Sequence, residues 1–87
     1  MPTIVVPPLM RDLTAGEARV RVPGRTVREA IDGLAERYPG VRSRLCAGTR
    51  LAPDLAVVVD GHLSRMGLLH PLEAQSEVRF IPAIEGG

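Results

Sequence analysis

The chain has 87 residues, of which 45% are apolar and 2% aromatic, and its formal net charge is +1. This length fits one small domain without internal repeats, and the near-balanced charge with so few aromatic residues excludes a surface built to bind nucleic acid. No apolar run approaches the roughly 20 residues that cross a bilayer, no secretory pattern opens the chain, and one cysteine cannot form an internal disulfide, so we expect a cytoplasmic protein without membrane contact.

Two strands are predicted near the N-terminus. Residues 3–6 form a β-branched run that ends at Pro7-Pro8, and prolines limit a strand at its hydrogen-bonding ends. Residues 9–17 are expected to be a loop. Residues 18–22 then alternate strictly between apolar and arginine side chains, which predicts a strand with one face buried and both arginines on the other face.

A helix is predicted from residue 26 to residue 38. Thr26 stands at the N-cap position after Pro23-Gly24, and Glu29 follows at the spacing of a capping box. Pro39-Gly40 ends the helix because proline cannot continue it. The apolar residues recur at steps of three and four and form one stripe that packs on the sheet: Val27, Ala30, Ile31, Leu34, Ala35 and Tyr38.

The middle of the chain predicts one more strand. Residues 41–46 are expected to add one helical turn, and residues 47–53 to form a loop. Residues 55–59 are a continuous apolar run, which favours a buried strand, and Asp60-Gly61 predicts a tight turn after it.

The last part of the chain completes the predicted sheet. Residues 63–66 are expected to form a short edge strand, 67–76 a loop, and 77–81 the final strand. The right-handed crossover rule places the first and last strands side by side and parallel, because the helix then covers a single face. We therefore predict an α+β fold of the β-grasp (ubiquitin-like) type over residues 1–81, with a mixed four- to five-stranded sheet and one main helix.

Residues 82–87 are expected to form a flexible tail that ends in Gly86-Gly87. Glycine has no Cβ, so such a tail can thread a narrow channel in a partner, and its terminal carboxylate is then the functional group. A frayed end without function is the alternative interpretation.

The open side of the sheet is the predicted partner-binding surface. Alternation along the last strand leaves Arg79 and Ile81 on the side away from the helix, and Arg19 and Arg21 project from the second strand on the same side. An exposed aliphatic side chain beside positive charges is typical of an interface. A solvated face is the alternative.

The strand order, the 26–38 helix, the turn at Val59-Asp60-Gly61 and the end of the chain from Phe80 to Gly87 resemble the ubiquitin-like sulfur carriers. These include the small subunit of molybdopterin synthase, the thiamine sulfur carrier and the cysteine-synthesis sulfur carrier. The proline-containing tail is the specific part of the resemblance, and it is most similar to the molybdopterin-synthase and cysteine-synthesis members.

The resemblance implies a carrier that is the substrate of other enzymes and has no catalytic residues of its own. An adenylating, ubiquitin-activating-like partner that uses ATP and magnesium activates the Gly87 carboxylate, and a sulfur donor converts it to a thiocarboxylate. A sulfur-accepting synthase or large subunit then uses the sulfur to make molybdopterin or a metabolite such as cysteine. The residues that would thread the partner are Pro82, Ala83, Ile84, Glu85 and Gly86.

Two other functions remain open from the sequence. The first is a ubiquitin-like modifier that is joined to target lysines through Gly87, and the second is a β-grasp binding module with an incidental tail.

All eleven basic residues are arginine. Codon bias is one explanation of this composition, and avoidance of amines that could attack an activated acyl group is the other.

The remaining reactive side chains do not suggest a further site. His62 and His70 lack the companions of a metal site, so no bound metal is expected. Cys46 is expected to be a small buried hydrophobic residue, with a transient bond to a partner as the alternative. Ser43 and Ser64 have no partners that the sequence places near them.

Overall fold

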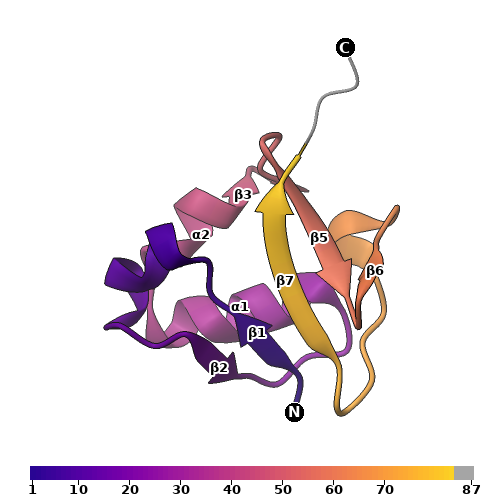
Figure 1. Ribbon diagram of the computed structural model, residues 1–87, viewed down its shortest axis with the longest axis horizontal. Helices are drawn as coiled ribbons and strands as arrows, with labels where there is room; N and C mark the ends of the chain where they lie inside the picture. The colour runs from indigo at the N-terminus through magenta and orange to yellow at the C-terminus, as the bar shows by residue number, and fades with distance from the viewer. Residues whose placement is uncertain (84–87) are drawn as a thin grey trace.

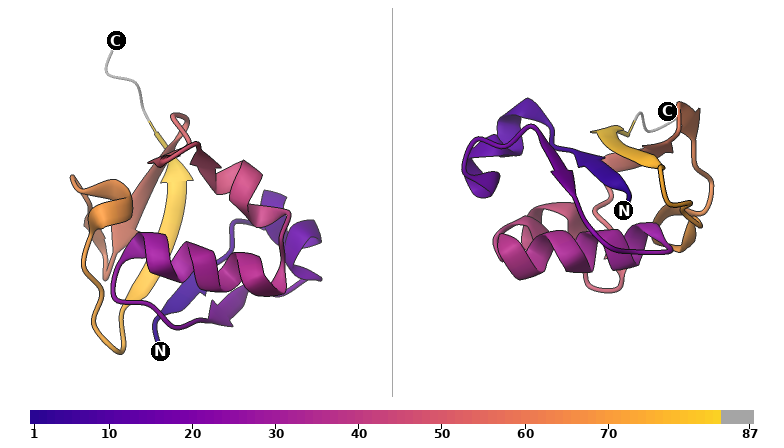
Figure 2. Two further views of the ribbon diagram at one scale, coloured as in Figure 1. Left: turned by 180° about the vertical axis from the view of Figure 1, so that it is seen from behind. Right: turned by 90° about the horizontal axis from the view of Figure 1, so that it is seen from below.

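The structure is a computed structural model that describes residues 1–83. A five-stranded mixed sheet in the order β2-β1-β7-β5-β6 forms one layer, and helix α1 (Val27–Arg37) covers one face of it (Figures 1 and 2). The strands are β1 (Thr3–Val5), β2 (Arg19–Arg21), β5 (Leu55–Val59), β6 (His62–Leu63) and β7 (Glu77–Pro82). The predicted β-grasp fold is confirmed.

Strands β1 and β7 form the parallel pair at the centre of the sheet. Strand β2 pairs antiparallel with β1, and β5 pairs antiparallel with β7. One row across these four strands places Val20, Ile4, Val78 and Val59 next to one another, and all four are at most 4% exposed. Burial of each such side chain stabilises the fold by about 1.5–3 kcal/mol, which fixes the register of the sheet.

The start of α1 is capped as the sequence predicts. The Thr26 hydroxyl accepts a hydrogen bond from the N–H of Glu29 at 3.2 Å. The Glu29 carboxylate accepts the N–H of Arg25 at 3.0 Å, one residue before the expected N–H of Thr26. The predicted apolar stripe is buried over Val27, Ala30, Ile31, Leu34 and Ala35, while Tyr38 is half-buried just after the helix.

The first expected loop is helical. Residues 9–17 were predicted without regular structure, but Pro8–Thr14 form the 3-10 helix η1. Pro8 suits the first turn because its ring holds φ near the helical value and because an N–H at this position would have no partner within the helix. Met10 and Thr14 are buried, and Ala15 ends the helix at a φ of 54°.

The segment after α1 also contains more structure than predicted. The expected helical turn is α2 (Val41–Leu45). The expected loop over residues 47–53 is wrong, because β3 (Cys46–Ala47) and β4 (Arg50–Leu51) pair as a hairpin around Gly48, whose φ is +62°.

The connection into the last strand differs in detail. Edge strand β6 covers residues 62–63, so it begins one residue earlier than the predicted strand of residues 63–66 and is shorter. It begins directly after the predicted tight turn, in which Asp60 and Gly61 have φ values of 51° and 82°. A 3-10 turn, η2 (Gly67–Leu69), lies within the segment expected to be a loop. No helix within residues 1–83 has the length and apolar composition needed to span a membrane.

Strand β7 continues one residue beyond its expected end at Ile81. Pro82 pairs with Leu55, and the Ala83 N–H donates to the Asp54 carbonyl at 2.8 Å. Alternate N–H groups of a strand point to opposite sides, so the missing N–H of Pro82 lies on the side of β1, which pairs with β7 only as far as Arg79. The proline therefore removes no hydrogen bond from the sheet.

Loss of the helix cap should destabilise the domain measurably. We expect Thr26→Ala to lower the free energy of unfolding by about 1 kcal/mol, because the N–H of Glu29 loses its acceptor. Urea denaturation followed by circular dichroism measures this change. Thr49→Ala at an exposed turn is the control and should change the stability by less than about 0.5 kcal/mol. Equal effects of the two substitutions would contradict the role of the cap.

Candidate functional site

The face of the sheet away from α1, called the open face below, is the candidate docking surface. The four residues predicted to bind partners, Arg19, Arg21, Arg79 and Ile81, all lie on it, because their neighbours in each strand point into the core. Their role in partner binding stays a prediction. The residues of the open face are Thr3, Val5, Arg19, Arg21, Ala56, Val58, Leu63, Glu77, Arg79 and Ile81.

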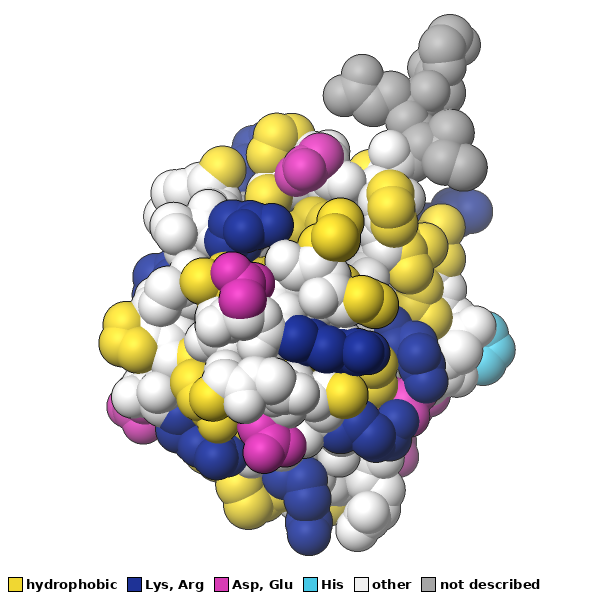
Figure 3. Space-filling model, turned by 60° about the vertical axis from the view of Figure 1, so that its left-hand side comes forward, with side chains coloured by type: hydrophobic (Ala, Val, Ile, Leu, Met, Phe, Trp, Pro, Cys, Tyr) yellow, Lys and Arg dark blue, Asp and Glu magenta, His cyan; other side chains and the backbone are white. Residues whose placement is uncertain are grey.

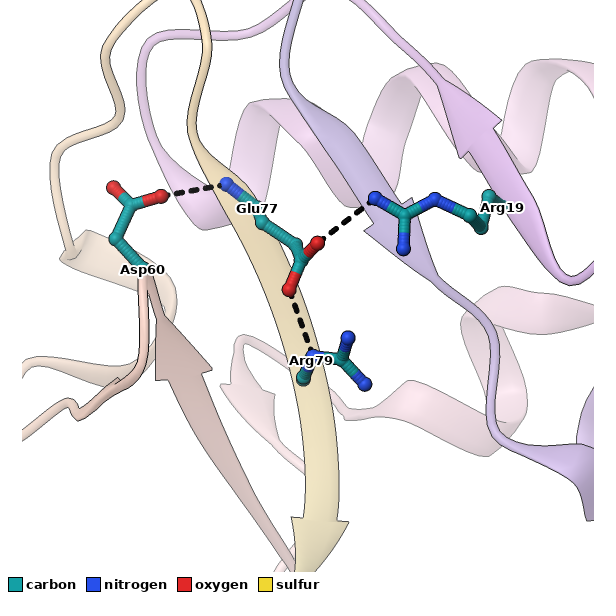
Figure 4. A network of polar contacts seen from close by, with 4 residues as sticks. All are labelled: Arg19, Asp60, Glu77 and Arg79. Atoms are coloured by element: carbon teal, nitrogen blue, oxygen red, sulfur yellow. Dashed lines mark hydrogen bonds and ion pairs between the residues drawn. The ribbon is translucent and has the colours of Figure 1, made fainter.

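Glu77 organises two of the arginines on the open face (Figure 4). One of its carboxylate oxygens accepts Nη2 of Arg19 and the other accepts Nε of Arg79, each at 2.8 Å. The N–H of Glu77 donates to Oδ1 of Asp60 at 2.8 Å, and its carbonyl accepts the N–H of Asp60 at 2.9 Å. Glu77 is therefore held in position by hydrogen bonds to both its backbone and its carboxylate.

These contacts shift the titration of Glu77. The hydrogen bonds from Arg19 and then Arg79 lower the pKa of the Glu77 carboxyl below its usual value of 4.5. The side chains of Glu77, Arg19 and Arg79 are 33%, 56% and 50% exposed, so solvent screens each ion pair. The network mainly fixes where the two guanidinium groups lie.

Apolar side chains occupy the rest of the open face. Val5, Ala56 and Val58 are half-buried, whereas Leu63 is 65% and Ile81 39% exposed. Figure 3 shows the open face obliquely, toward the right of the view, with yellow apolar side chains beside dark blue arginine side chains. An apolar strip bordered by oriented positive charges fits a protein partner with matching apolar and acidic groups.

The predicted tail divides at residue 83. Pro82 and Ala83 continue the pairing of β7 with β5. The predicted modification site Gly87 and the predicted threading residues Ile84, Glu85 and Gly86 lie outside the described residues.

A hollow of about 220 Å³ adjoins the end of β7 on the other side of the sheet. Leu9, Met10, Leu55, Phe80 and Pro82 line it. Leu9 is 86% exposed at its edge, so the hollow presents apolar surface to solvent.

The remaining reactive side chains that the structure describes make local contacts. Ser64 and His70, which the sequence did not link, lie 2.7 Å apart through Oγ and Nδ1, and Oγ of Ser64 also accepts the N–H of Met66. No carboxylate within residues 1–83 hydrogen-bonds to His70, and no group of three or more potential metal ligands occurs there. Cys46 is half-buried against the core, and this burial raises the pKa of its thiol, although Arg42 opposes the shift.

Sequence reasoning missed six residues of the open face: Thr3, Val5, Ala56, Val58, Leu63 and Glu77. Glu77 was recognised only as the start of a strand, and its contact with Arg19 joins residues 58 positions apart. Val58 and Leu63 complete the apolar strip because they pair directly across β5 and β6. The pairing register that creates both contacts is a property of the folded sheet.

Comparisons with known proteins agree with the fold and cover nearly the whole chain. The sequence model of the ThiS family matches residues 6–87. The comparison with curated proteins finds no significant match.

Three solved structures are similar over nearly the whole chain. A chain of the Amycolatopsis orientalis BexX/CysO complex is 30% identical, with a TM-score of 0.90 and 100% of both chains covered. Mycobacterium tuberculosis CysO is 25% identical, with a TM-score of 0.86, and 97% of this chain and 100% of that chain are covered. Haloferax volcanii SAMP1 is 26% identical, with a TM-score of 0.73 and coverages of 99% and 98%.

The contacts of Glu77 predict its response to pH. Its pKa falls on folding, so the ion pairs add stability above the unfolded-state pKa near 4.5, and this contribution is lost as the pH falls through the folded-state pKa. Titration of the side-chain carboxyl carbon by NMR should give a pKa below 4.5.

Removal of the first donor tests the cause of this shift. Arg19→Gln should raise the pKa of Glu77, while Arg21→Gln on the same face is the matched control. A pKa that responds equally to the two substitutions would show that general surface charge, and not the Arg19 hydrogen bond, lowers it.

Proposed function

Because the chain belongs to the ThiS family of ubiquitin-like sulfur carriers, we propose that it carries sulfur on the C-terminal carboxyl group of Gly87. The observation that supports this most is the extent of the family match, which includes Gly86 and Gly87. The chain acts in this proposal as the substrate of its partner enzymes.

The proposed chemistry has two steps on Gly87. In the first, the carboxylate attacks the α-phosphate of ATP, which an activating partner binds together with magnesium, and pyrophosphate leaves. In the second, a sulfide equivalent from a donor attacks the acyl carbon and displaces AMP, leaving a thiocarboxylate. A synthase that makes molybdopterin or a metabolite such as cysteine then accepts the sulfur, and the carboxylate is regenerated.

The end of β7 determines how much chain is left to reach the partner's active site. Pro82 and Ala83 are held to β5, so the reach of the tail depends on the four residues after Ala83. Four extended residues span at most about 14 Å. The activating partner must therefore approach closely, and its surface must contact the body of the domain beside β7.

The open face is the surface that we propose for this contact. Ile81 lies on this face one residue before Pro82, and Glu77 fixes the guanidinium groups of Arg19 and Arg79 on the same face. A similar chain has been crystallised in the Amycolatopsis orientalis BexX/CysO complex, which supports a carrier that works in complex with other proteins.

A second candidate function is protein modification. Haloferax volcanii SAMP1 is 26% identical, and structures of this name are described as small archaeal modifier proteins. A modifier would share the adenylation step and then transfer Gly87 to a target lysine. The two functions separate in the product: a carrier yields the free thiocarboxylate, and a modifier yields isopeptide-linked conjugates of higher mass.

Substitution of the last residue tests the proposed reaction site. We expect Gly87→Ala to slow adenylation at least about tenfold, because a Cβ next to the reacting carbon displaces it from the near-attack geometry. ATP–pyrophosphate exchange with the activating enzyme measures this rate, and the urea midpoint should not change.

Gly40→Ala is the matched control for this substitution. Gly40 is exposed and has a φ of −65°, which alanine also adopts. An adenylation rate for Gly87→Ala equal to that of Gly40→Ala would refute the proposed role of Gly87.

Substitution of Ile81 tests the docking surface. We expect Ile81→Asp to weaken binding to the activating enzyme at least about tenfold, because a carboxylate would be buried in an apolar contact without a partner. Isothermal titration calorimetry measures the affinity. Ala74→Asp adds the same charge at another exposed position and should bind like the unmodified protein. Unchanged binding of Ile81→Asp would place the interface elsewhere.

A further inference from the structure

A groove, separate from the hollow beside β7, lies on the side of the molecule that α1 covers, away from the open face. Figure 2 (left) shows the ribbon of α1 and of the orange segment that contains η2 on this side. The groove has a volume of about 580 Å³ and runs between α1, the β3–β4 hairpin and residues 65–69. Segment η2 packs against both α1 and β4, so these three parts of the chain are held together around the groove.

Three arginines line this groove: Arg28 from α1, Arg50 from the hairpin and Arg65 from the segment before η2. All three are exposed, and none forms an ion pair within residues 1–83. No aspartate or glutamate lines the groove, and the nearby Asp32 is already paired with Arg42 at 2.7 Å. The groove therefore has three positive charges and no neutralising group of its own.

The groove also exposes apolar side chains. Met66 and Leu69 are 54% and 69% exposed, and Leu51 of β4 is half-buried at the wall of the groove. Methionine adapts its shape to different apolar groups. A site with arginines and a methionine but without aromatic side chains suits aliphatic and carboxylate groups better than stacked bases.

Hydrogen bonds hold the segment that displays these side chains. The Ser64 hydroxyl accepts the Met66 N–H at 3.0 Å and lies 2.7 Å from Nδ1 of His70. The carbonyl of His70 in turn accepts the N–H of Val27 at the start of α1 at 3.0 Å. The Ser64–His70 pair thus keeps Arg65 and Met66 in place before a partner arrives, which reduces the ordering cost of binding.

We propose that this groove binds an acidic segment of a partner protein, with carboxylates on the three arginines and a leucine-like side chain against Met66 and Leu69. The open face lies on the opposite side of the sheet, so both surfaces can be occupied at once. The proposal uses only residues 1–83 and does not depend on chemistry at Gly87.

The test uses a fluorescein-labelled peptide that repeats the tripeptide Glu-Glu-Leu, with fluorescence anisotropy as the measure of affinity. A variant that combines Arg28→Gln, Arg50→Gln and Arg65→Gln should bind at least about tenfold more weakly than the unmodified protein. The matched control combines Arg25→Gln, Arg37→Gln and Arg44→Gln, which removes the same charge from exposed positions outside the groove, and it should bind within about twofold of the unmodified protein.

Further arms separate a specific groove from general attraction between opposite charges. A peptide of Glu-Glu-Ser repeats and a single-stranded oligonucleotide should both bind more weakly than the leucine peptide, and Met66→Ser should reduce binding of the leucine peptide only. Circular dichroism melting of every variant verifies the fold. Equal losses in the two triple variants, or equal binding of the serine peptide or the oligonucleotide, would overturn the proposal, as would failure of the leucine peptide to bind the unmodified protein.

Discussion

The parallel pairing of β1 with β7 is the constraint on which the rest of this structure depends. Strand β1 pairs with β2 on one side and with β7 on the other, and α1 covers one face of this sheet and leaves the other face open. Strand β1 ends opposite Arg79, whereas β7 continues to Pro82 along β5 alone. The end of β7 therefore emerges at an edge of the open face, beside the surface proposed to dock the activating partner.

The charges of the domain are arranged by the same pairing. Arg19 in β2 and Arg79 in β7 both pair with Val5 of β1, which lies between them, and the Glu77 carboxylate bridges the two arginines. Each exposed pair adds little stability, but together they fix two guanidinium groups next to an apolar strip. On the other side of the sheet Arg28 and its neighbours have no carboxylate in their groove, so the two faces are suited to different partners.

The sequence was sufficient where a pattern is local and repeated. Alternation predicted the outward arginines of β2 and β7, and the Thr26–Glu29 spacing predicted the cap of α1. Short elements escaped prediction because β3 and β4 have only two residues each and the seven residues of η1 are too few to establish a helical pattern in the sequence. Contacts such as Arg19–Glu77 and Ser64–His70 depend on register and loop closure, which single residues do not reveal.

The proposed function requires that this domain present a terminal carboxylate on which sulfur replaces one oxygen. Intact mass spectrometry of the protein purified from cells that make it tests this claim most directly. We predict a second species, heavier by the mass difference between one sulfur and one oxygen, which disappears when Gly87 is replaced by alanine. If only the carboxylate form is found while the activating enzyme and a sulfur donor are present, the claim is wrong.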